Sequence, residues 1–345
     1  MTTPRRPGLI RAIAHRLAGE HLALPIEGRL AGFDGATRWL NSEPLTPHGL
    51  RGRVVLVDFW TYTCVNWLRT LPYRRAWAAK YADAGLTLVG VHTPEFGFEH
   101  DLHNVIARTR ELGVEYPVVV DNDYAVWRAF DNHFWPALYL ADVEGRVRYH
   151  HFGEGEYAMT EMAVQQLLLE AGADDLDQEL VVVERRGLEV AADWQTLRSP
   201  ETYLGYAQGD RFASGARARF DAAHRYAGAA HLPLNYWDLF GIWTVAQDAV
   251  VLQEPGGRVA FQFEARDVNL VMGPAAGSGS IPFRVLLDGE AVDSAAGTDV
   301  GAEGRGTLDE QRTYQLVRQL EPIVERRFEI EFAVPGAEAY CFTFG

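Results

Sequence analysis

Cysteine is almost absent from this sequence. The chain has 345 residues and only two cysteines, Cys64 and Cys341. At most one disulfide bond can form, so a disulfide framework is excluded as the basis of stability. The two cysteines fall in segments with different sequence patterns, described below. We therefore expect both thiols to be reduced, as they are in the cytoplasm.

Long hydrophobic runs and an excess of positive charge are also lacking. No stretch approaches the roughly 18 apolar residues that span a bilayer, and the N-terminal residues show no apolar run of signal-peptide length. The 32 Lys and Arg residues stand against 47 Asp and Glu, which gives a formal charge of −15. This charge disfavours nucleic acid and anionic lipid as partners. The sequence therefore predicts a cytoplasmic protein with no membrane span, and a short amphipathic helix over residues 5–24.

Strands and helices alternate between residues 50 and 172. Apolar runs predict strands at 54–60, 86–92, 117–120, 137–140 and 146–152, and helical spacing predicts helices at 64–83, 98–112, 123–130 and 157–171. This alternation predicts crossover connections over a central sheet, with an antiparallel hairpin at its end. Residues 1–49 are expected to pack on this domain as an extension, and the acidic residues 173–198 to form a linker.

Short β-type runs separated by turns dominate residues 199–345. They are expected at 219–221, 243–246, 249–253, 259–264, 268–272, 283–287, 313–318, 327–332 and 340–344. Turn signals such as Pro255-Gly256-Gly257 and Asp288-Gly289 lie between them. Many short strands with such turns indicate a sandwich or jelly roll. The expected fold class is therefore an α/β domain followed by an all-β domain.

Cys64 has the sequence context of a reactive thiol. In the segment V-D-F-W-T-Y-T-C-V-N-W-L-R-T-L-P-Y it follows a buried strand and opens a helix. Unpaired N–H groups and the helix dipole stabilise a thiolate there, and such placement lowers a cysteine pKa from about 8.5 to between about 3.5 and 7.5. The alternative is a buried, inert side chain. Pro72 inside the helix normally costs about 3 kcal/mol and needs an explanation. A cis Trp135-Pro136 bond would place backbone beside the thiol.

These features resemble the thioredoxin superfamily, with Asp58 and Pro72 at matching spacings from Cys64. More narrowly, the segment is similar to the soluble C-terminal region of DipZ-type cytochrome c biogenesis proteins. Further matches are G-V-H-T-P-E-F at 90–96, N-H-F-W-P-A at 132–137, S-P-E-T-Y-L-G-Y at 199–206 and A-R-D-V-N-L-V-M-G-P at 265–274. The resemblance implies a thioredoxin-like domain at 50–172 and a carbohydrate-binding-module-like jelly roll at 199–345.

One position departs from the family's C-x-x-C motif, because Trp67 stands where the second cysteine is expected. In a dithiol enzyme the second thiol resolves the mixed disulfide, and without it the adduct waits for an external thiol. We therefore predict a thioredoxin-like enzyme with Cys64 as a single nucleophilic thiol and no cofactor. Its substrate would be a disulfide or a small organic electrophile, and its reductant an external thiol.

Two other functions stay open at this point. The first is a binding or scaffold protein whose thioredoxin fold has lost redox activity. The second is a one-cysteine peroxidase, in which peroxide oxidises Cys64 to a sulfenic acid that an external thiol reduces. Thr61, three residues before Cys64, gives a T-x-x-C pattern that resembles peroxiredoxins.

Several side chains near Cys64 in the sequence are candidates for the site. Trp67 either walls an apolar pocket beside the thiol, together with other aromatic residues, or fills the space that the cysteine left. The predicted substrate-binding residues are Trp60, Thr61, Tyr62, Asn66, Trp67, Trp135 and Pro136.

Two carboxylates are candidates for proton transfer. The resemblance implies that Asp58 is a buried proton acceptor near Cys64, or a structural relic of that role. Glu95 matches an acidic position near the thiol in thioredoxin relatives of the cytochrome maturation class, where it would tune the thiol pKa; otherwise it is a solvated loop carboxylate. Four histidines of this domain do not predict a metal site, because no convergent set of ligands supports zinc.

Overall fold

The computed structural model describes residues 24–345, which divide into two compact units with the boundary between Arg185 and Arg186. This boundary falls inside the segment 173–198 that the sequence marked as a linker. The helix expected over residues 5–24 lies, apart from Leu24, outside the described residues. From residue 24 onward, no helix has the length and apolar character needed to cross a membrane.

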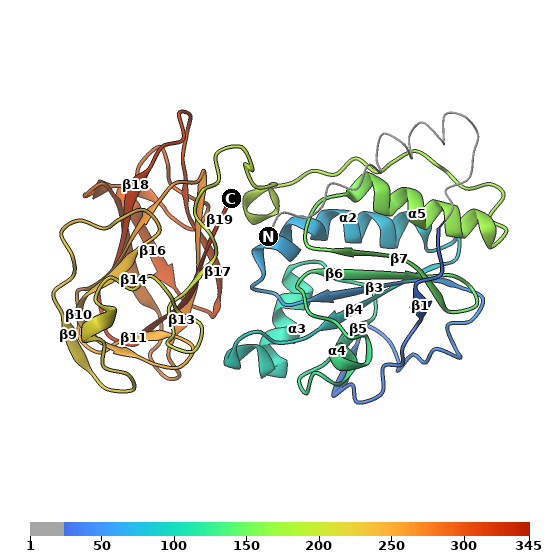
Figure 1. The fold of residues 1–345 in the computed structure, drawn as a ribbon, viewed down its shortest axis with the longest axis horizontal. Coiled ribbons are helices and arrows are strands. Elements are labelled where there is room, and N and C mark those ends of the chain that lie inside the picture. The colour runs from blue at the N-terminus through green and yellow to red at the C-terminus, as the bar shows by residue number, and fades with distance from the viewer. Residues whose placement is uncertain (1–23) are drawn as a thin grey trace. The chain divides into compact units, whose positions relative to one another are not determined.

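A seven-stranded sheet forms the middle of the first unit (Figure 1). The strand order is β1-β7-β6-β3-β4-β5-β2. β3 pairs in parallel with β4, and β4 with β5, whereas the other pairs are antiparallel. The strands are β1 (Gly28–Arg29), β2 (Arg38–Leu40), β3 (Val54–Trp60), β4 (Leu86–His92), β5 (Val118–Val120), β6 (Ala137–Ala141) and β7 (Arg146–Phe152).

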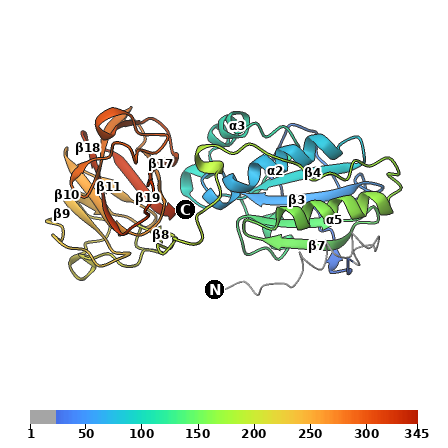
Figure 2. The same ribbon diagram turned by 90° about the horizontal axis from the view of Figure 1, so that it is seen from above.

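Helices cover both faces of this sheet. Figure 1 shows α2 and α5 along one face and α3 and α4 along the other, and Figure 2 shows α2 and α5 running along the strands when the unit is seen from above. The helices are α2 (Val65–Tyr81), α3 (Leu102–Glu111), α4 (Ala125–Ala129) and α5 (Tyr157–Glu170), with a 3₁₀ helix η1 (Gly97–His100) before α3. The expected helix at 98–112 is thus divided in two, because Asp101 has extended backbone and caps α3.

β3 determines where the site lies. All seven of its residues are buried, as its apolar run predicted. Trp60 at its end pairs with His92 at the end of β4, and Phe59 pairs with Ala137 at the start of β6. The residues that follow β3 and β4 and those that precede β6 therefore meet at one end of the strands.

Residues from the N-terminal segment form both outer edges of the sheet. β1 pairs with β7 and β2 pairs with β5. The side chain of Asn41 also donates to the carbonyl oxygens of Val114 and Tyr116, at 2.8 and 3.0 Å. Strands of two and three residues are too short to show a hydrophobic period, so the sequence did not predict β1 or β2.

The second unit is a large curled antiparallel sheet, as an all-β sandwich or jelly roll requires. Its strand order is β15-β14-β18-β12-β10-β11-β19-β13-β17, with β16, β8 and β9 paired to β14, β19 and β10. The strands are β8 (Thr202–Tyr203), β9 (His224–Tyr226), β10 (Trp237–Val245), β11 (Val250–Leu252), β12 (Gly257–Phe263), β13 (Asp267–Pro274), β14 (Ile281–Leu287), β15 (Glu290–Ala291), β16 (Arg305–Leu308), β17 (Arg312–Arg318), β18 (Arg326–Phe332) and β19 (Ala337–Phe344).

Two strands differ from those expected. The strand expected at 219–221 is only an isolated bridge at Phe220, and β9 begins three residues beyond that run. β10 begins at Trp237, six residues earlier than expected, because Trp237 and Trp243 both point into the core and extend the buried face.

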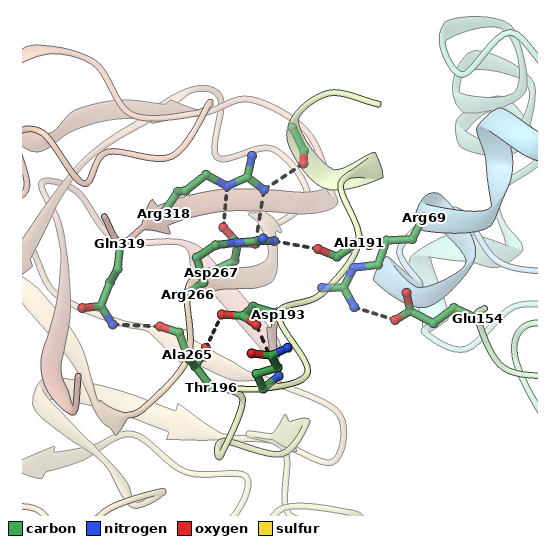
Figure 3. Close-up of polar contacts among 12 residues, drawn as sticks. Arg69, Glu154, Ala191, Asp193, Thr196, Ala265, Arg266, Asp267, Arg318 and Gln319 are labelled. Atoms are coloured by element: carbon green, nitrogen blue, oxygen red, sulfur yellow. Dashed lines mark hydrogen bonds and ion pairs between the residues drawn. The ribbon is translucent and has the colours of Figure 1, made fainter. Parts of the chain in front are cut away.

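An ion cluster around one buried carboxylate, Asp267, fixes the start of the second unit, as Figure 3 shows. Asp267 is 2% exposed and accepts hydrogen bonds from Arg318 and Arg266, both at 2.6 Å. The two guanidinium groups also donate to the backbone carbonyls of Gly187 and Ala191. Charge-assisted bonds of this kind hold residues 187–191, which the sequence placed in a linker, onto the β unit.

Candidate functional site

Cys64 is the N-cap residue of α2. Its backbone is extended, with φ −69° and ψ 106°, and its carbonyl accepts the first helical hydrogen bond from Leu68 at 3.0 Å. Its own N–H donates to the carbonyl of Thr61 at 3.3 Å, which closes the tight turn between β3 and the helix. The side chain is half-buried, and neither Cys64 nor Cys341 forms a disulfide. The thiol therefore lies at the positive end of a 17-residue helix.

Helix α2 continues through Pro72 to Tyr81, close to the end predicted for it. The Trp135–Pro136 bond is cis, also as predicted. Pro136 is buried and Trp135 is half-buried, with its ring 4.3 Å from that of Trp127. Ala137 pairs with Phe59, near the end of β3. Trp135 and Pro136, which precede Ala137, therefore lie at the end of the sheet where the Cys64 turn begins. Cys64 and the cis proline thus share one end of the sheet.

Trp67 lies inside the unit and not on its surface. Its ring is 0% exposed and stacks on Trp60 with a centroid separation of 4.3 Å and an interplanar angle of 19°. Its indole N–H donates to Oδ2 of Asp58 at 2.8 Å. Of the two roles that the sequence left open for Trp67, the structure supports the filling of interior space. A wall of a substrate pocket would need an accessible ring, and Trp60, also 0% exposed, is equally covered.

Asp58 has a partner at each oxygen. Trp67 donates to Oδ2, and Arg74 donates to Oδ1 at 2.9 Å and forms a buried ion pair. The side chains of Asp58 and Arg74 are 0% and 3% exposed. Asp58 therefore ties β3 to two positions of α2 that lie about two turns apart. The predicted proton transfer from Cys64 to Asp58 stays a prediction, but these two bonds give the carboxylate a structural role.

His92 and Tyr62 form a second buried ring cluster next to Trp60. His92 makes an edge contact with Trp60 at 4.9 Å and stacks on Tyr62 at 5.7 Å. His92 is fully buried, and among residues 24–345 neither of its ring nitrogens has a hydrogen-bond partner. Burial lowers the pKa of His92 to about 3, so the ring is neutral at physiological pH. Tyr62 is only 2% exposed, which leaves it little surface for contact with a substrate.

Glu99 is a site residue that the sequence analysis missed. Its carboxyl group is 0% exposed and accepts a hydrogen bond from the hydroxyl of Thr63 at 2.6 Å. It also accepts from the backbone N–H groups of Glu95 and Phe96, at 2.6 and 3.0 Å. Burial raises the pKa of Glu99 above its ordinary value, although these hydrogen bonds oppose the rise. No periodic pattern marks a buried acid in a loop, so only the motif around residues 90–99 could have indicated it.

Asn66 and Glu95 are half-buried, as accessible site residues would be. Asn66 accepts a hydrogen bond from Arg69 at 3.4 Å. Figure 3 shows the buried ion pair that Arg69 makes with Glu154, at 2.7 Å. Beside Trp135, Phe134 is 51% exposed with its ring 5.0 Å from Phe152, an aromatic surface that was not predicted. The substrate-binding roles of Asn66, Trp135 and Pro136 stay predictions.

The fold and the position of Cys64 define a thioredoxin-like protein. Residues 199–345 match the model of the family described as the thioredoxin-like C-terminal domain. Over 268 residues the chain is 34% identical to protein DipZ of Mycobacterium bovis, a match that covers 76% of this chain and 37% of DipZ. The resemblance drawn from the sequence is confirmed: the chain has a thioredoxin-like fold followed by a β domain that matches this family's model, and it is similar to DipZ across both.

Other relatives match a shorter part of the chain. The thiol-disulfide oxidoreductase YkuV of Bacillus subtilis is 29% identical over 136 residues, which cover 39% of this chain and 91% of YkuV. Among solved structures, a thioredoxin-like protein in its oxidised form is 29% identical, with a TM-score of 0.39, and covers 43% of this chain and 99% of its own. The chain is therefore related to thiol–disulfide oxidoreductases, while it spans about a third of the length of DipZ.

Proposed function

We propose that the protein is a thiol oxidoreductase in which Cys64 is the single reactive thiol. The observation that carries the proposal is the pairing of an accessible cysteine at the start of α2 with a buried tryptophan at the second motif position. A helix N-terminus stabilises the thiolate, which is the nucleophile in thiol–disulfide exchange. Trp67 supplies no thiol and bonds to Asp58 instead.

The reaction then takes two intermolecular steps. In the first, the Cys64 thiolate attacks one sulfur of a substrate disulfide, a new Sγ–S bond forms, and the other sulfur leaves as a thiolate. In the second, the thiolate of an external thiol attacks the substrate sulfur of this mixed disulfide and releases the Cys64 thiolate. The substrate half leaves as a disulfide with the external thiol. We also propose a reducing compartment such as the cytoplasm, because such compartments supply the external thiol.

Exchange should therefore depend on the external thiol. With a small disulfide such as bis(2-hydroxyethyl) disulfide and glutathione, we expect a rate that rises linearly with glutathione concentration, because the second step is intermolecular. The rate is measured by chromatography from the formation of the mixed disulfide between glutathione and 2-mercaptoethanol, which is the product of the second step. Cys64→Ser should reduce it to the uncatalysed rate. Cys341→Ser should leave it unchanged, since Cys341 is 1% exposed within β19.

The outcomes separate the alternative functions. A rate that saturates in both glutathione and the substrate disulfide would indicate an internal resolving step and contradict the single-thiol mechanism. An unreactive Cys64 would favour a redox-inactive binding protein. Consumption of peroxide that requires Cys64, without disulfide exchange, would favour the one-cysteine peroxidase.

A further inference from the structure

The exchange reaction leaves one buried acid unused. Glu99 belongs to η1 and is 36 residues from Thr63 in the sequence, yet its carboxyl group bonds to the hydroxyl of the residue that precedes Cys64. Its other oxygen accepts hydrogen bonds from two backbone N–H groups of the loop that follows β4. One carboxyl group thus joins two loops at the edge of the sheet where Cys64 lies.

We propose that Glu99 is a positioning residue for Cys64, which holds the Thr63–Cys64 turn and couples its own protonation to ionisation of the thiol. The inference rests on the proposed function, because it matters only if Cys64 reacts as a thiolate. It concerns the chemistry of the free thiol, however, so it can be tested separately from disulfide exchange.

The coupling follows from burial and like charge. A carboxylate with no exposed surface has little water to screen its charge, and two negative charges that approach each other oppose each other's ionisation. The donors that stabilise the charged form of Glu99 are a neutral hydroxyl and neutral backbone amides. Their bonds hold the carboxylate in place but leave its full negative charge near the turn. Deprotonation of Glu99 therefore disfavours the Cys64 thiolate, and the two groups titrate as a pair.

The surrounding charged groups do not remove this effect. Five titratable or charged groups near Glu99 are Tyr62 of the turn, Glu95 of the same loop, Asp101 and Arg108 of α3 and its cap, and Tyr124 before α4. Two histidines are also nearby: His92, which stacks on Tyr62 and is neutral, and His100, which follows Glu99 in η1. Arg108, the only cation among these five, forms an ion pair with Glu111. Two of the remaining groups are carboxylates, which add negative charge and do not offset it.

The test is the pH profile of Cys64 alkylation in the full chain. Wild type and Glu99→Gln are treated with iodoacetamide from pH 5 to 9, and modification of Cys64 is followed by peptide mass spectrometry. We expect the midpoint for Glu99→Gln to fall by about one pH unit, which makes alkylation about tenfold faster below the midpoint. Glu115→Gln, which removes the same charge at an exposed position, should keep the wild-type midpoint.

A second pair of variants keeps the carboxyl group in place. Thr63→Val removes the hydroxyl donor, so the carboxylate is less stabilised and the midpoint should fall by less than it does in Glu99→Gln. Thr63→Ser restores the donor and should restore the midpoint. Thermal unfolding shows whether Glu99→Gln folds. If it does not, the two Thr63 variants test whether Glu99 affects the ionisation of Cys64.

Three results would overturn the inference. They are an unchanged midpoint in Glu99→Gln, an equal shift in Glu115→Gln, and a shift in Glu95→Gln alone, which would return the acidic role to the residue predicted from the sequence. A wild-type Cys64 that is not alkylated at any pH would instead refute the proposed function. The two failures are therefore distinguishable.

Discussion

Trp67→Cys is expected to destabilise the first unit by about 3–5 kcal/mol, although it restores the C-x-x-C pair. The change removes a fully buried ring that stacks on Trp60 and leaves a cavity beside β3. It also removes the indole N–H that bonds to Asp58, and hydrogen bonds to charged groups contribute about 1.5–3 kcal/mol. Trp67 is therefore part of the interior of this protein, and a small thiol cannot replace it without loss.

The measurement must report on the first unit alone, because two units with separate cores need not unfold together. Hydrogen exchange of peptides from β3 and α2 at increasing urea concentration gives the local free energy of opening, and β19 peptides serve as an internal reference. Trp67→Phe is the matched control. It keeps an aromatic ring against Trp60, loses the N–H and part of the indole volume, and should cost less than Trp67→Cys. A Trp67→Cys variant within about 1 kcal/mol of wild type would show that the indole does not support the interior.

The second large effect is expected at Asp58. Asp58→Asn leaves the Arg74 guanidinium buried without a counter-charge, and breaking one side of a buried ion pair costs about 3–5 kcal/mol. The same exchange measurement applies. The double variant Asp58→Asn/Arg74→Met removes both charges and should cost less than the sum of the two single changes. A strictly additive double variant would contradict the ion-pair account.

The single variant Asp58→Asn also distinguishes the two roles considered for Asp58, proton acceptor and structural ion pair. If Asp58 accepts a proton from Cys64, then Asp58→Asn should shift the pH profile of Cys64 alkylation. The ion pair with Arg74 and the bond from Trp67 predict a loss of stability with little shift in that profile. A large shift in a stable variant would restore the proton-acceptor role that the family resemblance implied.

The fold was predictable where hydrophobic pattern and motif spacing carry the information. The run 54–60 became β3 with its predicted bounds, and the spacing around Cys64 correctly placed it at the start of a helix containing Pro72. Buried strands of this kind are continuous apolar runs bounded by turns, so a single sequence reveals them. The edge strands β1 and β2 have two and three residues, and their pairing depends on partners about 80 or more residues away in the sequence.

The site was less predictable, because its polar contacts join distant segments. The sequence identified Cys64, Asp58 and the replacement at Trp67, but nothing in it showed that the indole points inward to Asp58. Glu95 was chosen by its place in a motif, whereas the buried acid that bonds to the Cys64 turn lies four residues later at Glu99. Burial of a charged side chain is a tertiary property, and composition and periodicity do not reveal it.

The most direct measurement of the central claim is the mass of the adduct that Cys64 forms with oxidised glutathione. After incubation and acid quenching, the account predicts one glutathione per chain, located on Cys64 by peptide mapping. The adduct should persist after the oxidised glutathione is removed and disappear when reduced glutathione is added, because the chain has no second thiol at the Trp67 position to resolve it. An adduct that resolves without added thiol, or a Cys64 that remains unmodified while the protein is folded, would contradict the account.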